Sequence, residues 1–167
     1  AASIKIKELI AEEFTRHNYL LESDVLNELE KQAFKNIIGM DLSLTFYENS
    51  LKKLSKYLHK YHRQKPVVLI DEYDTPIHTA FYENYYKEII AFFRALLGAG
   101  LKDNTDIFKG VITGILRIAR ESIFSELNNL SVFSIMSPQF STQFGLMQEE
   151  VEKLLTDYEL ENKIKDV

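Results

Sequence analysis

The sequence of 167 residues contains no cysteine, which excludes disulfides and thiolate metal sites. No hydrophobic run approaches the roughly 20 residues of a membrane-spanning helix, and no signal-peptide pattern opens the chain. Positive charge is not in excess either, because 20 Lys and Arg stand against 25 Asp and Glu, a net charge of -5. The chain therefore has no global attraction for nucleic acid or an anionic membrane, and we expect a cytoplasmic protein without membrane contact.

The apolar content is that of an ordinary globular domain, with 46% hydrophobic and 12% aromatic residues. Apolar residues at helical spacing predict four helices before the last quarter of the chain, over 4–14, 24–39, 45–62 and 83–97, the last of them ended by Gly98 and Gly100. Apolar runs predict three strands, at 67–70, 107–113 and 131–136. Helices alternating with strands predict an α/β fold with a parallel sheet.

The first predicted strand runs directly into three carboxylates, in the stretch "VVLIDEYDTPIH" at 67–78. Ligands bind at the carboxyl ends of parallel strands, where Asp71 would hold a magnesium ion and Glu72 would activate a water molecule. An apolar strand followed by these two acids is the Walker B pattern of ATP hydrolysis. The pattern is short, and in the alternative interpretation Asp71 and Asp74 cap the next turn while Glu72 is solvated.

The second predicted strand also ends in polar residues, in "GVITGILRIARESIFSELNN". In a P-loop ATPase the strand beside Walker B ends in a polar sensor of the γ-phosphate or the attacking water. Thr113 is placed for that role, and Arg117 or Arg120 would reach phosphate charge. Alternatively, Thr113 caps a helix, and Arg117 pairs with Glu121 four residues later. If the sensor interpretation holds, the strands ending at Asp71 and Thr113 are adjacent and parallel, with both side chains at one sheet edge.

Four segments together resemble the AAA-ATPase-like family of bacteria: "VVLIDEYDTPIH", "FFRALLGAGLKDN", "GVITGILRIARESIFSELNNL" and "FGLMQEEVEKLL". Members are P-loop ATPase domains often fused to a C-terminal nuclease-like domain of the restriction-endonuclease superfamily. The resemblance implies ATP and Mg²⁺ as cofactors, with Asp71 for the metal, Glu72 as catalytic base, and Thr113 with Arg117 as the sensor region. Asp74, Asn128 and Asn129 match distinctive positions without an assigned role, and Asp74 joins the candidates for nucleotide contact.

The chain departs from the family in its glycines. None of the six begins Gly-x-x-x-x-Gly-Lys, so the phosphate-binding loop is not among these residues. We therefore expect a P-loop NTPase-like core without its central strand over 1–145, the start of a small helical lid over 146–167, and no ATP hydrolysis by this fragment alone. The expected partners are a nucleotide in the intact protein and further copies of the chain at open sheet edges. Nucleic acid would bind only through the absent nuclease-like domain.

Two other functions compete with the ATPase. The first is a metal-dependent phosphoesterase or nuclease that uses Asp71, Glu72 and Asp74 directly, and the second is a helical interaction domain without chemistry. His78 would complete an oxygen–nitrogen metal site with Asp71 and Asp74, although histidine suits transition metals better than magnesium. His59 and His62 lie three residues apart at a predicted helix end, where they either bind a metal or, as we expect, complement the negative pole of the helix.

Overall fold

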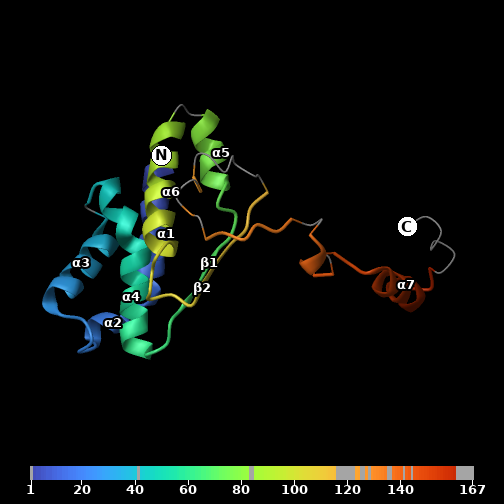
Figure 1. Ribbon diagram of the computed structural model, residues 1–167, viewed down its shortest axis with the longest axis horizontal. Helices are drawn as coiled ribbons and strands as arrows, with labels where there is room; N and C mark the ends of the chain where they lie inside the picture. Colours follow the sequence, from blue (N-terminus) through green and yellow to red (C-terminus); the bar gives the residue numbers. More distant parts are fainter. Residues whose placement is uncertain are drawn as a thin grey trace. The chain divides into compact units, whose positions relative to one another are not determined.

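The computed structural model describes residues 2–40, 42–82, 85–115, 123–124, 127, 129–134, 137–140, 142–143 and 145–160. The chain divides into two compact units, Ala1–Asn129 and Leu130–Val167. Unit 1 holds the predicted functional residues and is mostly helical, with a small parallel sheet (Figure 1). Its helices are α1 (Ala2–Arg16), α2 (Tyr19–Glu22), α3 (Glu28–Gly39), the 3₁₀ helix η1 (Leu44–Asn49), α4 (Ser50–His62), α5 (Thr75–Tyr82) and α6 (Tyr86–Leu101).

The core of unit 1 forms where the apolar stripes of these helices meet. The rings of Phe14 in α1 and Phe34 in α3 lie 4.9 Å apart between centroids, and both side chains are fully buried. Tyr47 of η1 is also fully buried, and its hydroxyl donates to the Ile37 carbonyl at 3.0 Å. Each such side chain contributes about 1.5–3 kcal/mol on burial. The helices therefore form a packed scaffold beside the strands.

Helix α6 continues past the two glycines that were predicted to end it. Gly98 and Gly100 lie inside the helix, which ends at Leu101. Gly100 is buried, and a Cβ there would approach Leu51 Cδ2 of α4 to 2.5 Å. The helix-stop prediction was wrong because this glycine provides room for close packing of α6 on α4, which sequence-local reasoning does not see.

Strands β1 (Val67–Ile70) and β2 (Lys109–Ile112) pair in parallel, with Val67 opposite Lys109 and Ile70 opposite Ile112. Backbone hydrogen bonds extend the ladder at both ends, from Phe108 N–H to the Pro66 carbonyl at 2.9 Å and from Thr113 N–H to the Ile70 carbonyl at 2.9 Å. The prediction of adjacent parallel strands is confirmed. Within the described ranges each strand pairs only with the other, and self-association through their outer edges stays a prediction.

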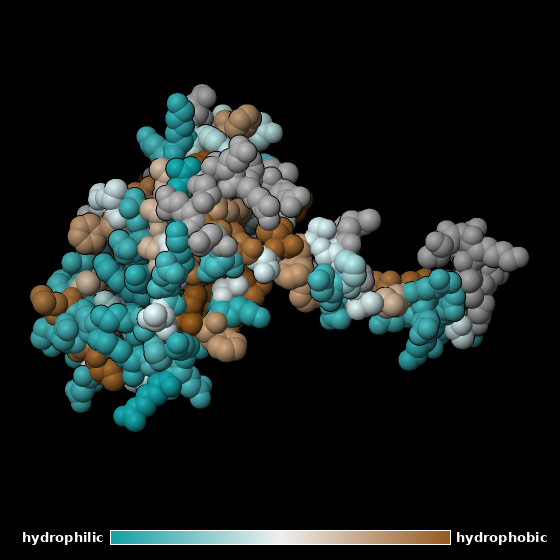
Figure 2. All heavy atoms as spheres, in the orientation of Figure 1, coloured by the Kyte–Doolittle hydropathy of each residue, from teal (hydrophilic) through white to brown (hydrophobic). Residues whose placement is uncertain are grey.

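Only one face of β1 is buried, although the strand is apolar throughout. Val68 is 9% exposed, whereas the next residue, Leu69, is 74% exposed. Alternate residues point to opposite faces. Val68 pairs with Gly110, and a Cβ at Gly110 would meet the Leu101 side chain of α6, so the face that carries Val68 packs against α6. The other face carries Val67, Leu69 and Val111, and no described helix buries it. Figure 2 shows a largely hydrophilic surface on the helical side of unit 1, with hydrophobic residues reaching the surface nearer the strands.

Unit 2 contains a short 3₁₀ helix, η2 (Pro138–Phe140), and α7 (Gln148–Asp157). The predicted strand at 131–136 is not present over residues 131–134, and residues 135 and 136 lie outside the described part. Local bonds compete with strand pairing there: Ser134 N–H donates to Ser137 Oγ at 2.9 Å, and the Phe133 and Phe140 rings lie 4.8 Å apart. The predicted last helix is present as α7, and Glu159 follows it with a φ of 58°. The predicted domain boundary at 145 stays a prediction.

Over the described ranges, no helix combines the length and the apolarity needed to cross a membrane.

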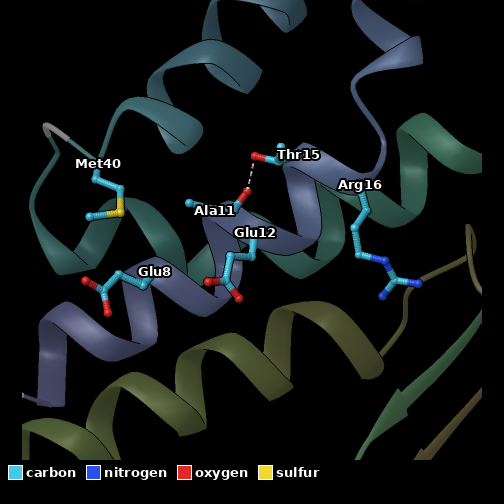
Figure 3. Close-up of a pocket in the computed structure, with 6 residues that line it drawn as sticks. All are labelled: Glu8, Ala11, Glu12, Thr15, Arg16 and Met40. Carbon is cyan, nitrogen blue, oxygen red and sulfur yellow. Dashed lines mark hydrogen bonds between the residues drawn. The ribbon is translucent and has the colours of Figure 1, made fainter.

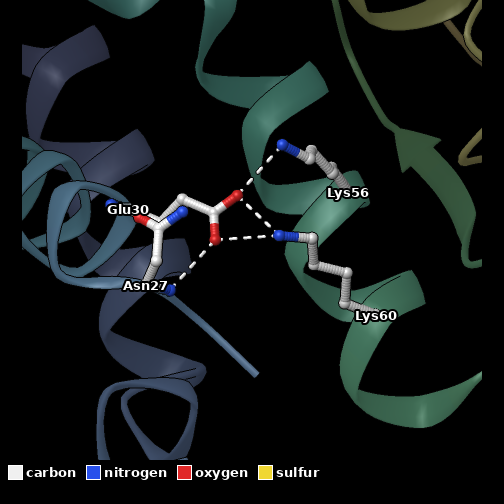
Figure 4. Close-up of polar contacts among 4 residues, drawn as sticks. All are labelled: Asn27, Glu30, Lys56 and Lys60. Atoms are coloured by element: carbon white, nitrogen blue, oxygen red, sulfur yellow. Dashed lines mark hydrogen bonds and ion pairs between the residues drawn. The ribbon is translucent and has the colours of Figure 1, made fainter. Parts of the chain in front are cut away.

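Glu30 ties α3 to α4 through two lysines (Figure 4). Its carboxylate accepts from Lys60 Nζ at 2.7 and 2.8 Å, from Lys56 Nζ at 3.0 Å and from the Asn27 N–H at 3.2 Å. Asn27 returns the contact, since its side chain caps α3 by accepting from the Glu30 N–H at 2.9 Å. Burial alone would raise the pKa of Glu30, but these hydrogen bonds outweigh it and lower the pKa from 4.5 to about 2.

We expect Glu30→Gln to lower the free energy of unfolding at pH 7, because the variant loses the charged contacts to both lysines. The loss should be about 1–2 kcal/mol, since both lysines are partly solvent-screened. A carboxylate whose folded pKa is depressed stabilises the fold above its unfolded pKa and loses that effect on acidification. The stability difference between wild type and variant should therefore shrink as pH falls from 4.5 towards about 2. Urea unfolding across this range measures it, with the exposed Glu12→Gln of α1 as control. A constant difference down to pH 2 would contradict the assignment.

Candidate functional site at the carboxyl ends of β1 and β2

The parallel register brings the ends of both strands to one edge of the sheet. Asp71 follows β1 and Thr113 follows β2, and the Thr113 hydroxyl donates a hydrogen bond to Asp71 Oδ1. The Glu72 N–H donates to the same oxygen at 3.0 Å. Two donors therefore orient the Asp71 carboxylate, which stays exposed to solvent.

Glu72 occupies a backbone conformation that side-chain-bearing residues adopt infrequently. Its φ is 49°, in the left-handed region, which costs a non-glycine residue about 1 kcal/mol or more. The side chain is exposed and accepts from Thr75 Oγ1 at 3.5 Å, a long contact that leaves the carboxylate largely to solvent. The left-handed residue turns the chain sharply after β1, so that two exposed acids are followed by two buried residues.

Tyr73 and Asp74 are the buried pair, at 7% and 3% exposure. The Tyr73 N–H donates to the Thr113 carbonyl at 3.1 Å, and its ring lies 5.2 Å from that of Phe124. The Asp74 carbonyl accepts from the N–H groups of Ile77 and His78, both at 3.0 Å, at the start of α5. The turn after β1 is thus fastened both to the end of β2 and to the first turn of α5.

The Asp74 carboxylate points into the protein, with a side-chain exposure of 5%. Its Oδ2 accepts from the Ile115 N–H at 3.1 Å and lies 3.9 Å from His78 Nε2. Between Thr113 and Ile115 the chain has Gly114, where a Cβ would lie 2.5 Å from the Tyr73 ring and 2.8 Å from Asp74 Oδ1. Glycine is therefore required for the two turns to approach this closely.

The model of the family described as "Predicted AAA-ATPase" matches residues 3–124, a range that includes both strands and both turns. The chain belongs to this family. No curated protein and no solved structure matches the chain. Unit 2 lies outside the matched range, so the family membership rests on unit 1.

Within this AAA-ATPase-like unit, the structure brings together four of the predicted site residues, Asp71, Glu72, Asp74 and Thr113, around the two turns. Arg117, together with Arg120, Glu121 and Asn128, lies outside the described residues. Asn129 is described, and its Nδ2 donates to the Leu101 carbonyl at 3.4 Å, at the end of α6. That contact is structural and is separate from the two turns.

The histidines have different partners. His59 Nδ1 lies 2.8 Å from Asp106 Oδ1, and His62 Nε2 lies 2.9 Å from the Tyr19 hydroxyl, so the two imidazoles do not converge. His78 faces Asp74 rather than Asp71. In the described ranges, no group of three or more His, Cys, Asp or Glu side chains is arranged to hold a metal ion.

Two residues of the site were missed in the sequence, Gly114 and Ile115. Gly114 matters because the structure has no room for a Cβ there, and Ile115 contributes its backbone N–H. Neither role depends on a side chain, so neither leaves a residue pattern in the sequence. The signal available was "TGI" directly after a predicted strand, since an isolated glycine there indicates a close backbone approach.

An open surface pocket of about 400 Å³ lies elsewhere on this unit (Figure 3). Five of its lining residues are on α1, among them Glu8, Glu12 and Arg16, and the sixth is Met40 after α3. Thr15 Oγ1 is turned back to the Ala11 carbonyl at 2.7 Å. None of the residues at the two strand ends lines this pocket.

We expect Gly114→Ala to lower the free energy of unfolding by about 1–3 kcal/mol, because the new Cβ overlaps the Tyr73 ring and Asp74. Gly110→Ala is the matched control, since the atoms nearest to its Cβ are at the end of the Leu101 side chain, which can move. Thermal and urea unfolding of both variants measure the difference. Equal losses in the two variants would show that the turns are not tightly packed.

Proposed function

We propose that the turns after β1 and β2 carry the metal, catalytic-base and sensor positions of an ATP-hydrolysing site. The observation that supports this proposal is the hydrogen bond from Thr113 Oγ1 to Asp71 Oδ1 across two parallel strand ends. A polar sensor directly beside the metal-binding acid is the arrangement that phosphoanhydride hydrolysis requires. Membership of the AAA-ATPase-like family supports a nucleotide as the ligand.

The carboxylate oxygens of Asp71 are suitable ligands for magnesium. Oδ1 accepts both hydrogen bonds, from Thr113 and from the Glu72 N–H, so Oδ2 is the oxygen that would face the ion, directly or through its water. Carboxylate oxygen is the ligand type that Mg²⁺ prefers, and one or two carboxylates are the usual protein share of such sites. The ion, when bound, neutralises charge that develops on the β- and γ-phosphate oxygens.

Glu72 is proposed as the general base. Its carboxylate is exposed and is next to the proposed metal-binding acid, and among the described residues the side-chain contact it accepts is the long one from Thr75. A side-chain oxygen of Glu72 would take a proton from the attacking water, which a carboxylate can do without competing with a strong internal donor.

Thr113 is proposed to orient that water. A threonine hydroxyl has one proton and two lone pairs, and here the proton is donated to Asp71. The Thr113 oxygen therefore remains a hydrogen-bond acceptor. It would accept a hydrogen bond from one O–H of the water, while the Glu72 carboxylate removes the proton of the other O–H. Arg117, four residues later, is proposed to contact phosphate charge.

The geometry disfavours the three-carboxylate phosphoesterase. That function needs Asp71, Glu72 and Asp74 to face one ion, and Asp74 is directed inward onto the Ile115 N–H. An apolar sheet face remains for the interaction-domain alternative, but no feature of it selects a partner. The ATPase therefore remains the function that the site supports best.

None of the six glycines begins a Gly-x-x-x-x-Gly-Lys motif. The proposed site would therefore need phosphate-binding amides and a lysine that these residues do not supply. Experiments on hydrolysis therefore use the intact protein.

We expect Glu72→Gln to lower kcat for ATP hydrolysis by about 10²–10⁴-fold, the range expected on loss of a general base. Nucleotide affinity should stay within about threefold, because the amide keeps the shape of the side chain and phosphate contacts lie elsewhere. Steady-state hydrolysis and equilibrium binding of a fluorescent nucleotide measure the two quantities. Glu88→Gln, an exposed acid on α6, is the control. Unchanged hydrolysis in Glu72→Gln would remove the base assignment.

We expect Asp71→Ala to differ by weakening magnesium-dependent binding. The affinity for nucleotide with magnesium should fall about tenfold or more, while the affinity measured in EDTA should change little. Asp24→Ala, at an exposed loop position, is the control. Equal losses with and without magnesium would mean that Asp71 acts on the fold rather than on the ion.

A further inference from the structure

Asp74 is a buried acid that follows the two exposed acids of the proposed site. Its side chain is 5% exposed, whereas Asp71 and Glu72 beside it are open to solvent. A carboxylate is costly to bury unless hydrogen bonds and charges compensate it. At Asp74 the Ile115 N–H at 3.1 Å supplies one such bond, and His78 Nε2 lies 3.9 Å away.

The donor of that bond is close to the sensor. Ile115 comes two residues after Thr113, and the Thr113 carbonyl itself accepts from the Tyr73 N–H at 3.1 Å. The segment 113–115 is therefore held at both ends by consecutive residues of the β1 turn, at one end by Tyr73 and at the other by Asp74. Gly114 lies between them with no space for a side chain.

Asp74 also fixes where α5 begins. Its carbonyl accepts the N–H groups of Ile77 and His78 in the first turn of that helix, both at 3.0 Å. One residue thus joins the end of β1, the end of β2 and the start of α5. A displacement of Asp74 would move the segment that carries the Thr113 hydroxyl.

We propose that Asp74 is a positioning residue, which holds segment 113–115 so that the Thr113 hydroxyl stays on Asp71. The proposal rests on the proposed function, and it replaces a nucleotide contact by Asp74 with a contact inside the protein. The distinction is chemical. Positioning needs only an acceptor oxygen at the Ile115 N–H, whereas a contact with magnesium or with its water shell depends on the negative charge.

Asp74→Asn and Asp74→Ala in the intact protein separate these roles. Asn keeps a side-chain oxygen that can accept from Ile115 and removes the charge, whereas Ala removes the acceptor. We expect Asp74→Ala to lower kcat about tenfold or more with nucleotide affinity within about threefold, and Asp74→Asn to restore kcat to within about threefold of wild type. Asp24→Ala is the exposed control. If Asp74→Ala does not fold, Asp74→Ser, whose hydroxyl is too short to reach Ile115, takes its place.

Amide hydrogen exchange at Ile115 provides a readout that does not depend on hydrolysis. Exchange should be faster than wild type in Asp74→Ala and slow in Asp74→Asn. If the amide stays protected in Asp74→Ala, the contact does not hold the segment and the proposal fails. It also fails if the amide is exposed but kcat is unchanged, because Thr113 then does not depend on Asp74.

Two further outcomes separate the proposal from the proposed function. If both variants lose magnesium-nucleotide affinity equally, Asp74 is a ligand contact and its positioning role is overturned. If the intact wild-type protein shows no hydrolysis, the ATPase falls together with the catalytic part of this proposal. The exchange result then decides alone whether Asp74 holds segment 113–115.

Discussion

The parallel pairing of β1 with β2 is the constraint on which the rest of the site depends. Because Ile70 lies opposite Ile112, the first residues beyond the strands, Asp71 and Thr113, are brought side by side. A slip of one residue in this register would turn alternate side chains to the other face and separate the two. The helices contribute by fixing one face of the pair, where α6 approaches Gly110 through Leu101. The geometry of the two turns therefore follows from backbone pairing four residues long.

Much of this arrangement could be predicted from the sequence, because its signals are local. The strand at 67–70 has the predicted bounds, since α4 ends at His62 and an apolar run of β-branched and leucine residues follows Pro66. The rule that parallel strands end at one edge then placed Asp71 beside Thr113. These predictions needed only the pattern of each segment, the carboxyl-end rule and the arrangement of P-loop ATPases, in which the sensor strand lies beside Walker B.

The rest depended on contacts between distant segments. Gly100 has the signature of a helix stop, but its role is set by Leu51, which the sequence does not place beside it. Asp74 has the signature of a third site acid, but a backbone N–H 41 residues later turns it inward. The predicted strand at 131–136 had the right composition, but strand formation also requires a neighbouring strand, and at 131–134 local bonds prevail. Each of these predictions used a correct propensity and lacked the partner that decides its outcome.

The left-handed backbone at Glu72 has a consequence for how this turn can evolve or be redesigned. At a φ of 49° glycine is the least strained residue and asparagine the next. Selection for stability alone would therefore drive position 72 towards these two residues, neither of which can act as a general base. Under the proposed function, a glutamate kept here sacrifices stability for a catalytic carboxylate, and stability and activity then oppose each other at this one position. Among proteins that share this turn, glycine or asparagine at this position would mark those that keep the fold without the proposed catalytic base.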